Sequence, residues 1–184
     1  KGIIEEKYEE AEKTGLSNGT FEYSVSSDDT VTITKYVGEE TKVVVPQIID
    51  GKNVKIIGSR AFYANRNVLS VQFPEGLTEI GDSAFSQCTS LDNVVIPDGV
   101  TFINSMAFDL CSSLKNLRIG NGITAIYFAT FRGTAIEKID IPEGIESISD
   151  DAFRDCRALS EVTLPKTLKK IDGLAFANAA FEKI

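Results

Sequence analysis

The stretch IPDGVTFINSMAFDLCSSL occupies residues 96–114 and repeats, with substitutions, along most of the chain. Within it, Ala107 precedes Phe108, and Ile103 lies five residues before that Phe. The same Phe recurs at intervals of 23, 23, 23, 22 and 23 residues. A nearly constant period of this length indicates a solenoid, in which each repeat forms one coil. The recurring residues are Phe62, Phe85, Phe108, Phe131, Phe153 and Phe176, preceded by Ile57, Ile80, Ile103, Ile126, Ile148 and Ile171.

Between these markers lies a second block of the form Leu-x-x-Val-x-Ile-Pro, as in Leu91 to Pro97. Its last two apolar residues alternate, which predicts a short strand with one buried face, and the Pro ends that strand. A turn, usually with Gly, leads into a second extended segment that ends at the recurring Ile. The adjacent Ala and Phe predict a short helical or 3-10 turn, because a small residue lets neighbouring coils approach closely. Stacked coils would bury Val on Val and Phe on Phe.

Residues 96–114 resemble the repeat of the BspA-like, or Treponema-type, leucine-rich-repeat family, and residues 73–91 nearly match the same pattern. The resemblance covers about residues 43–184. It implies an α/β, β-rich repeat solenoid: a right-handed superhelix with short strands, short helical turns and an N-terminal β cap. It also implies a bacterial cell-surface or secreted protein used in adhesion or host interaction, and it names no ligand.

Three segments are expected along the chain. Residues 1–20 are predicted to form an N-terminal helix or linker, with an amphipathic helix at about 3–13, and residues 21–49 a cap of three alternating strands. Residues 50–184 hold about six coils, and a hairpin at 49–54 leads into the first. The last coil would leave an open edge, which favours edge-to-edge association with another chain.

Composition argues against several classes of function. The 184 residues carry a formal charge of -8 with a pI near 4.7, so the chain would repel a phosphate backbone and we expect no nucleic-acid partner. Histidine is absent, which removes the commonest general base and metal ligand, and we expect no catalytic residue, metal or cofactor. No apolar run approaches the roughly 20 residues of a membrane span, so direct membrane insertion is not expected. Because the sequence starts at Lys1, we expect any signal peptide or anchor to lie outside it, with an extracellular or cell-surface location as the resemblance implies.

The cysteines and the paired carboxylates have structural interpretations. Cys88, Cys111 and Cys156 share one repeat position, where we expect small buried apolar side chains. A disulfide between Cys88 and Cys111 is the alternative. Adjacent carboxylates such as Asp150 and Asp151 are expected at solvated turns. Two catalytic carboxylates would have to converge in a cleft, and the sequence pattern does not indicate such a cleft.

The outward-facing residues of the predicted strands form the candidate binding surface. Two parallel columns are expected, mostly polar and mixed in charge, and the resemblance implies that a leucine-rich repeat binds its ligand there. The alternative is that this face is merely solvated. The columns comprise Ser70, Gln72, Asn93, Val95, Asn116, Arg118, Lys138, Asp140, Glu161 and Thr163.

Three aromatic residues break the repeat pattern. Tyr127 and Phe128 stand where other copies carry small or polar residues, and Phe102 stands where they carry Glu, Ala, Ser or Lys. The rings either form an exposed patch that contributes to binding, or turn inward because the loop at Gly133-Thr134 is one residue shorter.

These observations favour a non-catalytic recognition or adhesion module. We expect it to bind a protein or glycan, including one derived from a host, through the strand face of the solenoid. The alternative is a structural spacer or scaffold that presents a neighbouring domain. An enzyme is the least favoured class.

Overall fold

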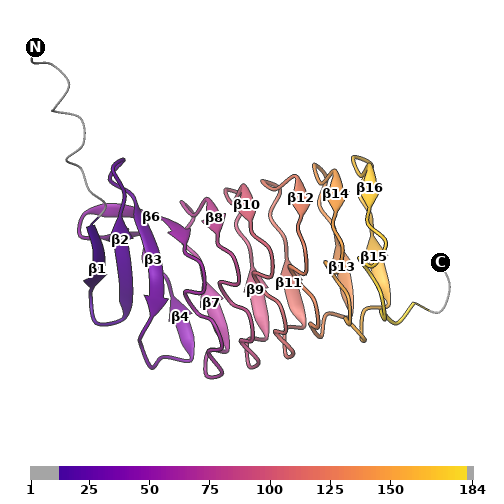
Figure 1. The fold of residues 1–184 in the computed structure, drawn as a ribbon, viewed down its shortest axis with the longest axis horizontal. Coiled ribbons are helices and arrows are strands. Elements are labelled where there is room, and N and C mark those ends of the chain that lie inside the picture. Colours follow the sequence, from indigo (N-terminus) through magenta and orange to yellow (C-terminus); the bar gives the residue numbers. More distant parts are fainter. Residues whose placement is uncertain (1–12, 182–184) are drawn as a thin grey trace, which may run out of the picture.

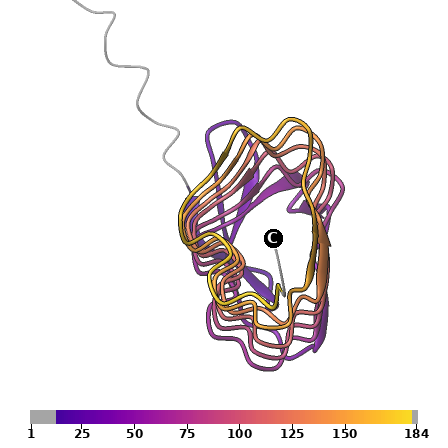
Figure 2. The same ribbon diagram turned by 90° about the vertical axis from the view of Figure 1, so that its right-hand side faces the viewer.

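The computed structural model describes residues 13–181, which wind into a β-solenoid of about six coils (Figure 1). Viewed along the long axis, the coils nest behind one another in one closed outline (Figure 2). The solenoid predicted from the 22- or 23-residue period is therefore confirmed.

One long side of the solenoid, here called the strand face, consists of three-residue parallel strands. Equivalent positions pair in register, so Ser70 pairs with Asn93 and Asn93 with Asn116. The middle residue of each strand points into the core and its two neighbours point outward, as the alternation predicts. The strands are β4 (Lys42–Val44), β7 (Ser70–Gln72), β9 (Asn93–Val95), β11 (Asn116–Arg118), β13 (Lys138–Asp140) and β15 (Glu161–Thr163).

A second ladder, here called the second face, is built from the segments that end on the recurring Ile. Those Ile side chains are buried from Ile57 to Ile148, whereas Ile171 in the last of these strands is 43% exposed. The strands are β6 (Lys52–Ile57), β8 (Glu79–Ile80), β10 (Phe102–Ile103), β12 (Ala125–Ile126), β14 (Ser147–Ile148) and β16 (Lys170–Ile171).

The predicted helical or 3-10 turns at Ala-Phe are wrong: residues 13–181 contain no helix. Ser83 and Gln87 instead have left-handed backbones, with φ of 54° and 62°, which interrupt a helical run. Successive N–H groups alternate in direction, so Ser86 donates within the turn to Ser83, whereas Phe85 donates to Ala107 of the next coil. In the stacked coils, every second N–H group of this segment donates a hydrogen bond to the next coil. A helix would require all of these N–H groups to donate within one coil.

The core is a continuous stack of aromatic rings along the solenoid axis. It begins at Tyr36 of the cap and passes through each recurring Phe to Phe176, with ring centroids 4.6 to 5.6 Å apart. The rings of Phe85 and Phe108 are nearly parallel, at an interplanar angle of 2°. The predicted burial of Phe on Phe is confirmed.

An antiparallel sheet precedes the coils and pairs with them. β2 (Phe21–Val25) pairs with β3 (Val31–Tyr36), and β3 then runs parallel to β6, so the second face continues into this sheet. The third strand that we expected in the cap is β4, which belongs to the strand face because it pairs in parallel with β7. The expected hairpin is present as β5 (Ile48–Ile49) against the start of β6.

The chain also has a strand before residue 21, where the sequence predicts a helix or linker. β1 (Lys13–Ser17) pairs antiparallel with β2, so that expectation is wrong for residues 13–17. The rest of the predicted amphipathic helix lies outside the described residues. The two strands form a hairpin, and its turn contains Asn18-Gly19, a local sequence signal for a hairpin that the helical interpretation missed.

Both ladders are interrupted beside the coil that contains β11 and β12. The strand-face sheet of β4 ends at β11, and a separate sheet joins β13 to β15. On the second face one sheet ends at β10 and another begins at β12. A Cβ added to Gly120 or Gly122 would lie 2.3 Å from a backbone oxygen of the preceding coil. Only glycine permits this close approach, which accompanies the change in ladder pairing.

Candidate functional site

The ten residues predicted to face outward all lie on five strands of the strand face, namely β7, β9, β11, β13 and β15. Nine of them are exposed and Ser70 is half-buried. Strand register aligns them in two columns within each of two sheets, with Asn93 beside Asn116 in the first sheet and Lys138 beside Glu161 in the second. The strand face is therefore a polar surface running along the solenoid.

The charged part of this face is largely paired within the chain. Lys138 contacts Glu161 of the next strand, and Arg118 donates to the Oδ1 atom of Asp98 over 2.9 Å. Each of these four side chains is more than half exposed, so each pair contributes little to stability. The pairs do reduce the charge that β11 to β15 present to a ligand.

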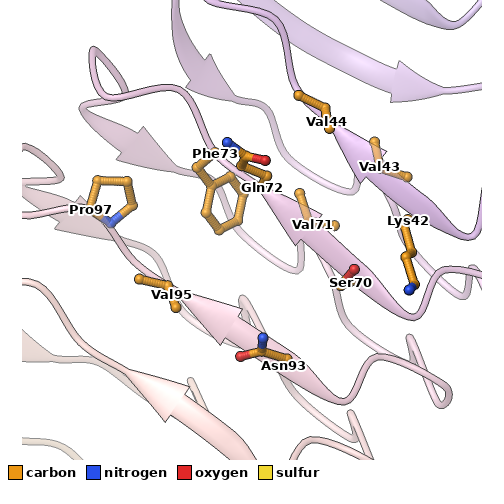
Figure 3. A pocket seen from close by; sticks show the side chains of 10 residues that line it. All are labelled: Lys42, Val43, Val44, Ser70, Val71, Gln72, Phe73, Asn93, Val95 and Pro97. Carbon is orange, nitrogen blue, oxygen red and sulfur yellow. The ribbon is translucent and has the colours of Figure 1, made fainter.

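The other half of the face, from β4 to β9, contains a surface pocket of about 510 Å³ (Figure 3). Val44 and Val95 are 62% and 50% exposed, and Phe73 forms part of the lining with only 8% exposure. Figure 3 shows Lys42, Ser70 and Asn93 along one row of the three strands, with Val44, Gln72 and Val95 along the other. This half combines apolar side chains with amides, a hydroxyl and the ammonium group of Lys42, in a depression that is about half open to solvent.

Lys42 and Val44 of this pocket were not among the sequence candidates. The sequence pattern places their strand in the cap, because Pro46 and Pro74 are 28 residues apart, which breaks the repeat interval. The segment Val43-Val44-Val45-Pro46 nevertheless matches the Val-x-Ile-Pro block with Val45 in place of Ile. That match is the signal that could have identified the strand.

Phe102 lies in β10 of the second face, and Tyr127 and Phe128 follow directly after β12, so none of the three unusual aromatic residues lies on the strand face. Phe102 and Tyr127 have ring centroids 5.1 Å apart, at the interruption between β10 and β12. Phe102 is 36% exposed, Phe128 is 43% exposed, and Tyr127 is half-buried. The exposure of Phe102 and Phe128 agrees with the first of the two alternatives, an exposed patch. The structure does not bring it together with the strand-face columns, which belong to other sheets.

The cysteines are all free and buried, so the disulfide alternative is not realised. Desolvation raises the pKa of Cys88 to about 12, and it also raises the pKa of Cys111 and Cys156. A thiol held protonated in this way is a poor nucleophile at neutral pH. The three residues contribute to packing, as predicted from their shared repeat position.

A network of two buried carboxylates and two partly exposed arginines ties the β11 coil to its two neighbours. Arg132 donates from Nε and Nη2 to the two carboxylate oxygens of Asp109, over 2.8 and 3.1 Å, and its Nη1 lies 3.7 Å from Asp151. The Asp109 hydrogen bond also raises the pKa of Arg132. Asp109 and Asp151 are 4% and 6% exposed, so the prediction that Asp151 lies at a solvated turn is wrong. Its burial follows from pairing with Arg132 and Arg154, which sequence spacing did not reveal.

These carboxylates are occupied by arginines, and they do not converge on a cleft. Within residues 13–181 there is no group of three or more His, Cys, Asp or Glu side chains arranged to hold a metal ion. We take the strand-face pocket as the candidate functional site.

The stacked coils, the parallel three-residue strands and the outward-facing columns define a leucine-rich-repeat solenoid. Comparison of sequences gives the family. The BspA type leucine-rich repeat region matches residues 31–156 and 124–184, in six copies. The chain belongs to this family, as its repeat pattern indicated. No curated protein matches the chain.

Solved structures of bacterial proteins share the fold. A leucine-rich cell surface protein from Faecalibacterium prausnitzii is 36% identical with a TM-score of 0.82, and the match covers 92% of this chain and 47% of that protein. The Treponema pallidum leucine-rich-repeat protein is 26% identical with a TM-score of 0.74, covering 86% of each chain. A Eubacterium ventriosum leucine-rich-repeat protein, at 24% identity and a TM-score of 0.74, shares the fold over all of this chain and 57% of its own length. This chain thus spans about half the length of the first of these proteins.

Between residues 13 and 181 there is no helix of the length and apolar character needed to cross a membrane.

Proposed function

We propose that this chain is a non-catalytic recognition module of a bacterial cell-surface or secreted protein, and that it binds a protein or glycan through the strand face. The observation that carries the proposal is the pocket formed by β4, β7 and β9. Family membership supports a binding role, and the description of the F. prausnitzii relative as a cell surface protein supports the location.

The centre of binding is assigned to the β4 to β9 half of the strand face. Val44 and Val95 offer apolar surface that a partner can remove from water, at a gain of about 25 cal/mol per Å². Gln72 and Asn93 offer amide donors and acceptors beside them. In contrast, Arg118 and Lys138 are already paired, so a ligand there would have to replace existing contacts.

A single substitution in each half tests this assignment. The chain is screened against immobilised extracellular-matrix proteins and a glycan array, and the binders are then measured with Val95→Lys and with Thr163→Lys as the matched control. Both positions lie outward in equivalent strands, and both are exposed. We expect Val95→Lys to weaken binding by at least about tenfold, since it places a charge in an apolar contact, and Thr163→Lys to change it little. Equal effects of the two variants on a folded chain would contradict the assignment.

A second candidate function is a spacer that presents a neighbouring domain. The uninterrupted aromatic stack from Tyr36 to Phe176 favours it, because close-packed rings resist bending of the solenoid. Two results together would favour the spacer. Neither screen would yield a binder, and a longer protein that contains this chain would lose activity when coils are removed but not when Val95 is replaced.

A further inference from the structure

The strand β4 is paired on one side only. β7 pairs with both β4 and β9, and β9 pairs with both β7 and β11, whereas β4 pairs with β7 alone and ends its sheet. Within residues 13–181 no other strand covers its second side. β4 is therefore an open edge directly beside the strand-face pocket, whose lining includes all three of its residues.

The direction of the existing hydrogen bonds identifies the backbone groups on that edge. Val45 donates to the carbonyl of Gln72 over 3.0 Å, and the carbonyl of Thr41 accepts from Leu69 over 2.6 Å. Residues 41 and 45 thus face β7, and so does Val43 by the alternation of a strand. The N–H and C=O groups of Lys42 and Val44 face the other way, and no hydrogen bond from the described residues reaches them.

The side chains at this edge are also available. Val44 is 62% exposed and Lys42 is exposed, so an apolar contact and a positive charge flank the free peptide groups. Unpaired peptide groups in a row are satisfied best by another extended backbone, which is how several protein families capture peptides. A sugar lacks the repeated donor and acceptor spacing of such a backbone.

We propose that an extended segment of a partner protein adds to the open edge of β4 as a short extra strand. An apolar residue of the segment covers Val44, and an acidic residue lies near Lys42. The strand is three residues long and Pro46 follows two residues after it, so the edge accepts a short segment and does not template a long sheet. This inference rests on the proposed function and specifies the class of ligand.

The main-chain contact is tested by comparing Val44→Pro with Val44→Thr. The probe is a set of nine-residue peptides selected from a random phage-displayed library on the full chain. Proline removes the Val44 N–H, which faces away from β7 and is not part of the existing ladder, whereas threonine keeps the N–H and the β-branched shape. We expect Val44→Pro to weaken peptide binding at least tenfold and Val44→Thr to weaken it less than threefold.

A second measurement leaves the protein unchanged and so does not depend on how Val44→Pro folds. Each residue of a selected peptide is N-methylated in turn, which blocks one backbone donor at a time. Added-strand pairing predicts that methylation weakens binding at alternate residues only, because successive N–H groups of a strand point to opposite sides.

The outcomes separate this inference from the proposed function. Four outcomes would each overturn strand addition. Val44→Pro and Val44→Thr could weaken peptide binding equally, or neither could weaken it. The methylation series could show no alternation, or the library could yield no peptide. If Val95→Lys still abolishes capture of a matrix protein or glycan in those cases, the strand face remains the binding surface. If Val95→Lys has no effect either, the proposed function fails as well.

Discussion

The thiol of Cys111 donates a hydrogen bond to the backbone carbonyl of Phe85, one coil earlier in the chain, over 3.1 Å. Cys88 makes the same bond to Phe62 and Cys156 to Phe131. The cysteine column thus fills a small buried space and also satisfies a carbonyl of the preceding coil. Thiol–carbonyl bonds are weak, but their repetition links successive coils at the same point.

Burial predicts that these thiols are unreactive in the folded chain. We expect a thiol reagent such as DTNB at about pH 8 to modify none of the three cysteines, because their raised pKa keeps them protonated and packing blocks access. Unfolding in guanidinium chloride should expose all three. Rapid labelling under native conditions, with circular dichroism unchanged, would contradict the buried arrangement.

The raised pKa of the buried Cys88 thiol predicts that the stability of the folded chain falls at alkaline pH. In the unfolded chain the Cys88 thiol releases its proton near the ordinary cysteine pKa of 9.0, whereas in the folded chain burial raises that pKa to about 12. A thiol whose pKa is higher in the folded chain stabilises the folded state at pH values below its pKa in the unfolded chain. This contribution is lost as pH rises from about 9 to about 12. Urea unfolding at increasing pH measures the decline. Cys88→Ala should show a shallower decline than the unsubstituted chain, and an identical slope would refute this origin.

The arginine network predicts a large effect of Arg132→Met on stability. The substitution leaves buried Asp109 without its cation and removes one of the two cations near Asp151, and the loss of one partner of a buried pair costs about 3 kcal/mol. Arg118→Met is the matched control, because Arg118 forms an exposed pair whose removal costs less than about 1 kcal/mol. Chemical denaturation compares the two. Similar free energies of unfolding for both variants would show that the network does not hold the β11 coil.

Close approach of the β11 coil to its neighbour predicts that Gly122→Ala is poorly tolerated. Its Cβ would meet the Val100 carbonyl oxygen at 2.3 Å, so the backbone must shift, with an expected cost of about 3 kcal/mol. At Gly173 an added Cβ meets nothing within 4 Å, so Gly173→Ala should be nearly neutral. Thermal unfolding of both variants tests the difference, and a stable Gly122→Ala chain would mean that the two coils are farther apart.

The aromatic stack predicts that Phe108→Ala lowers the free energy of unfolding by about 3 to 5 kcal/mol, since it opens a cavity between two coils. Phe108 is fully buried and stacks on both Phe85 and Phe131. Phe128→Ala is the control, because that ring is 43% exposed. Urea denaturation should show a small change for the control. Comparable losses for both would indicate that Phe128 also belongs to the core.

The repeated residues were sufficient to predict the main architecture. The spacing of Ile, Ala-Phe and Val-x-Ile specified the solenoid, the buried stack and the outward columns, because each coil buries the same positions against the same neighbours. The burial of the cysteines was predictable for the same reason. A repeat makes long-range contacts readable, since the partner of each residue lies one period away.

Features that depend on contacts between coils or on departures from the repeat required the tertiary structure. The recurring Ala-Phe pair predicts helical turns, but every second N–H there bonds to the next coil. The burial of Asp151 against Arg132 and the exposure of Phe102 and Phe128 depend on contacts between segments with no common pattern.

The same distinction applies to the candidate site. Sequence alone determined which strand residues face outward, because alternation along a strand is a local property. Only the tertiary structure showed that β4 joins this face, that the charges from β11 to β15 are largely paired, and that the peptide groups of Lys42 and Val44 are left open. Strand pairing and ion pairing between coils are decided by distances in space, which the order of residues does not contain.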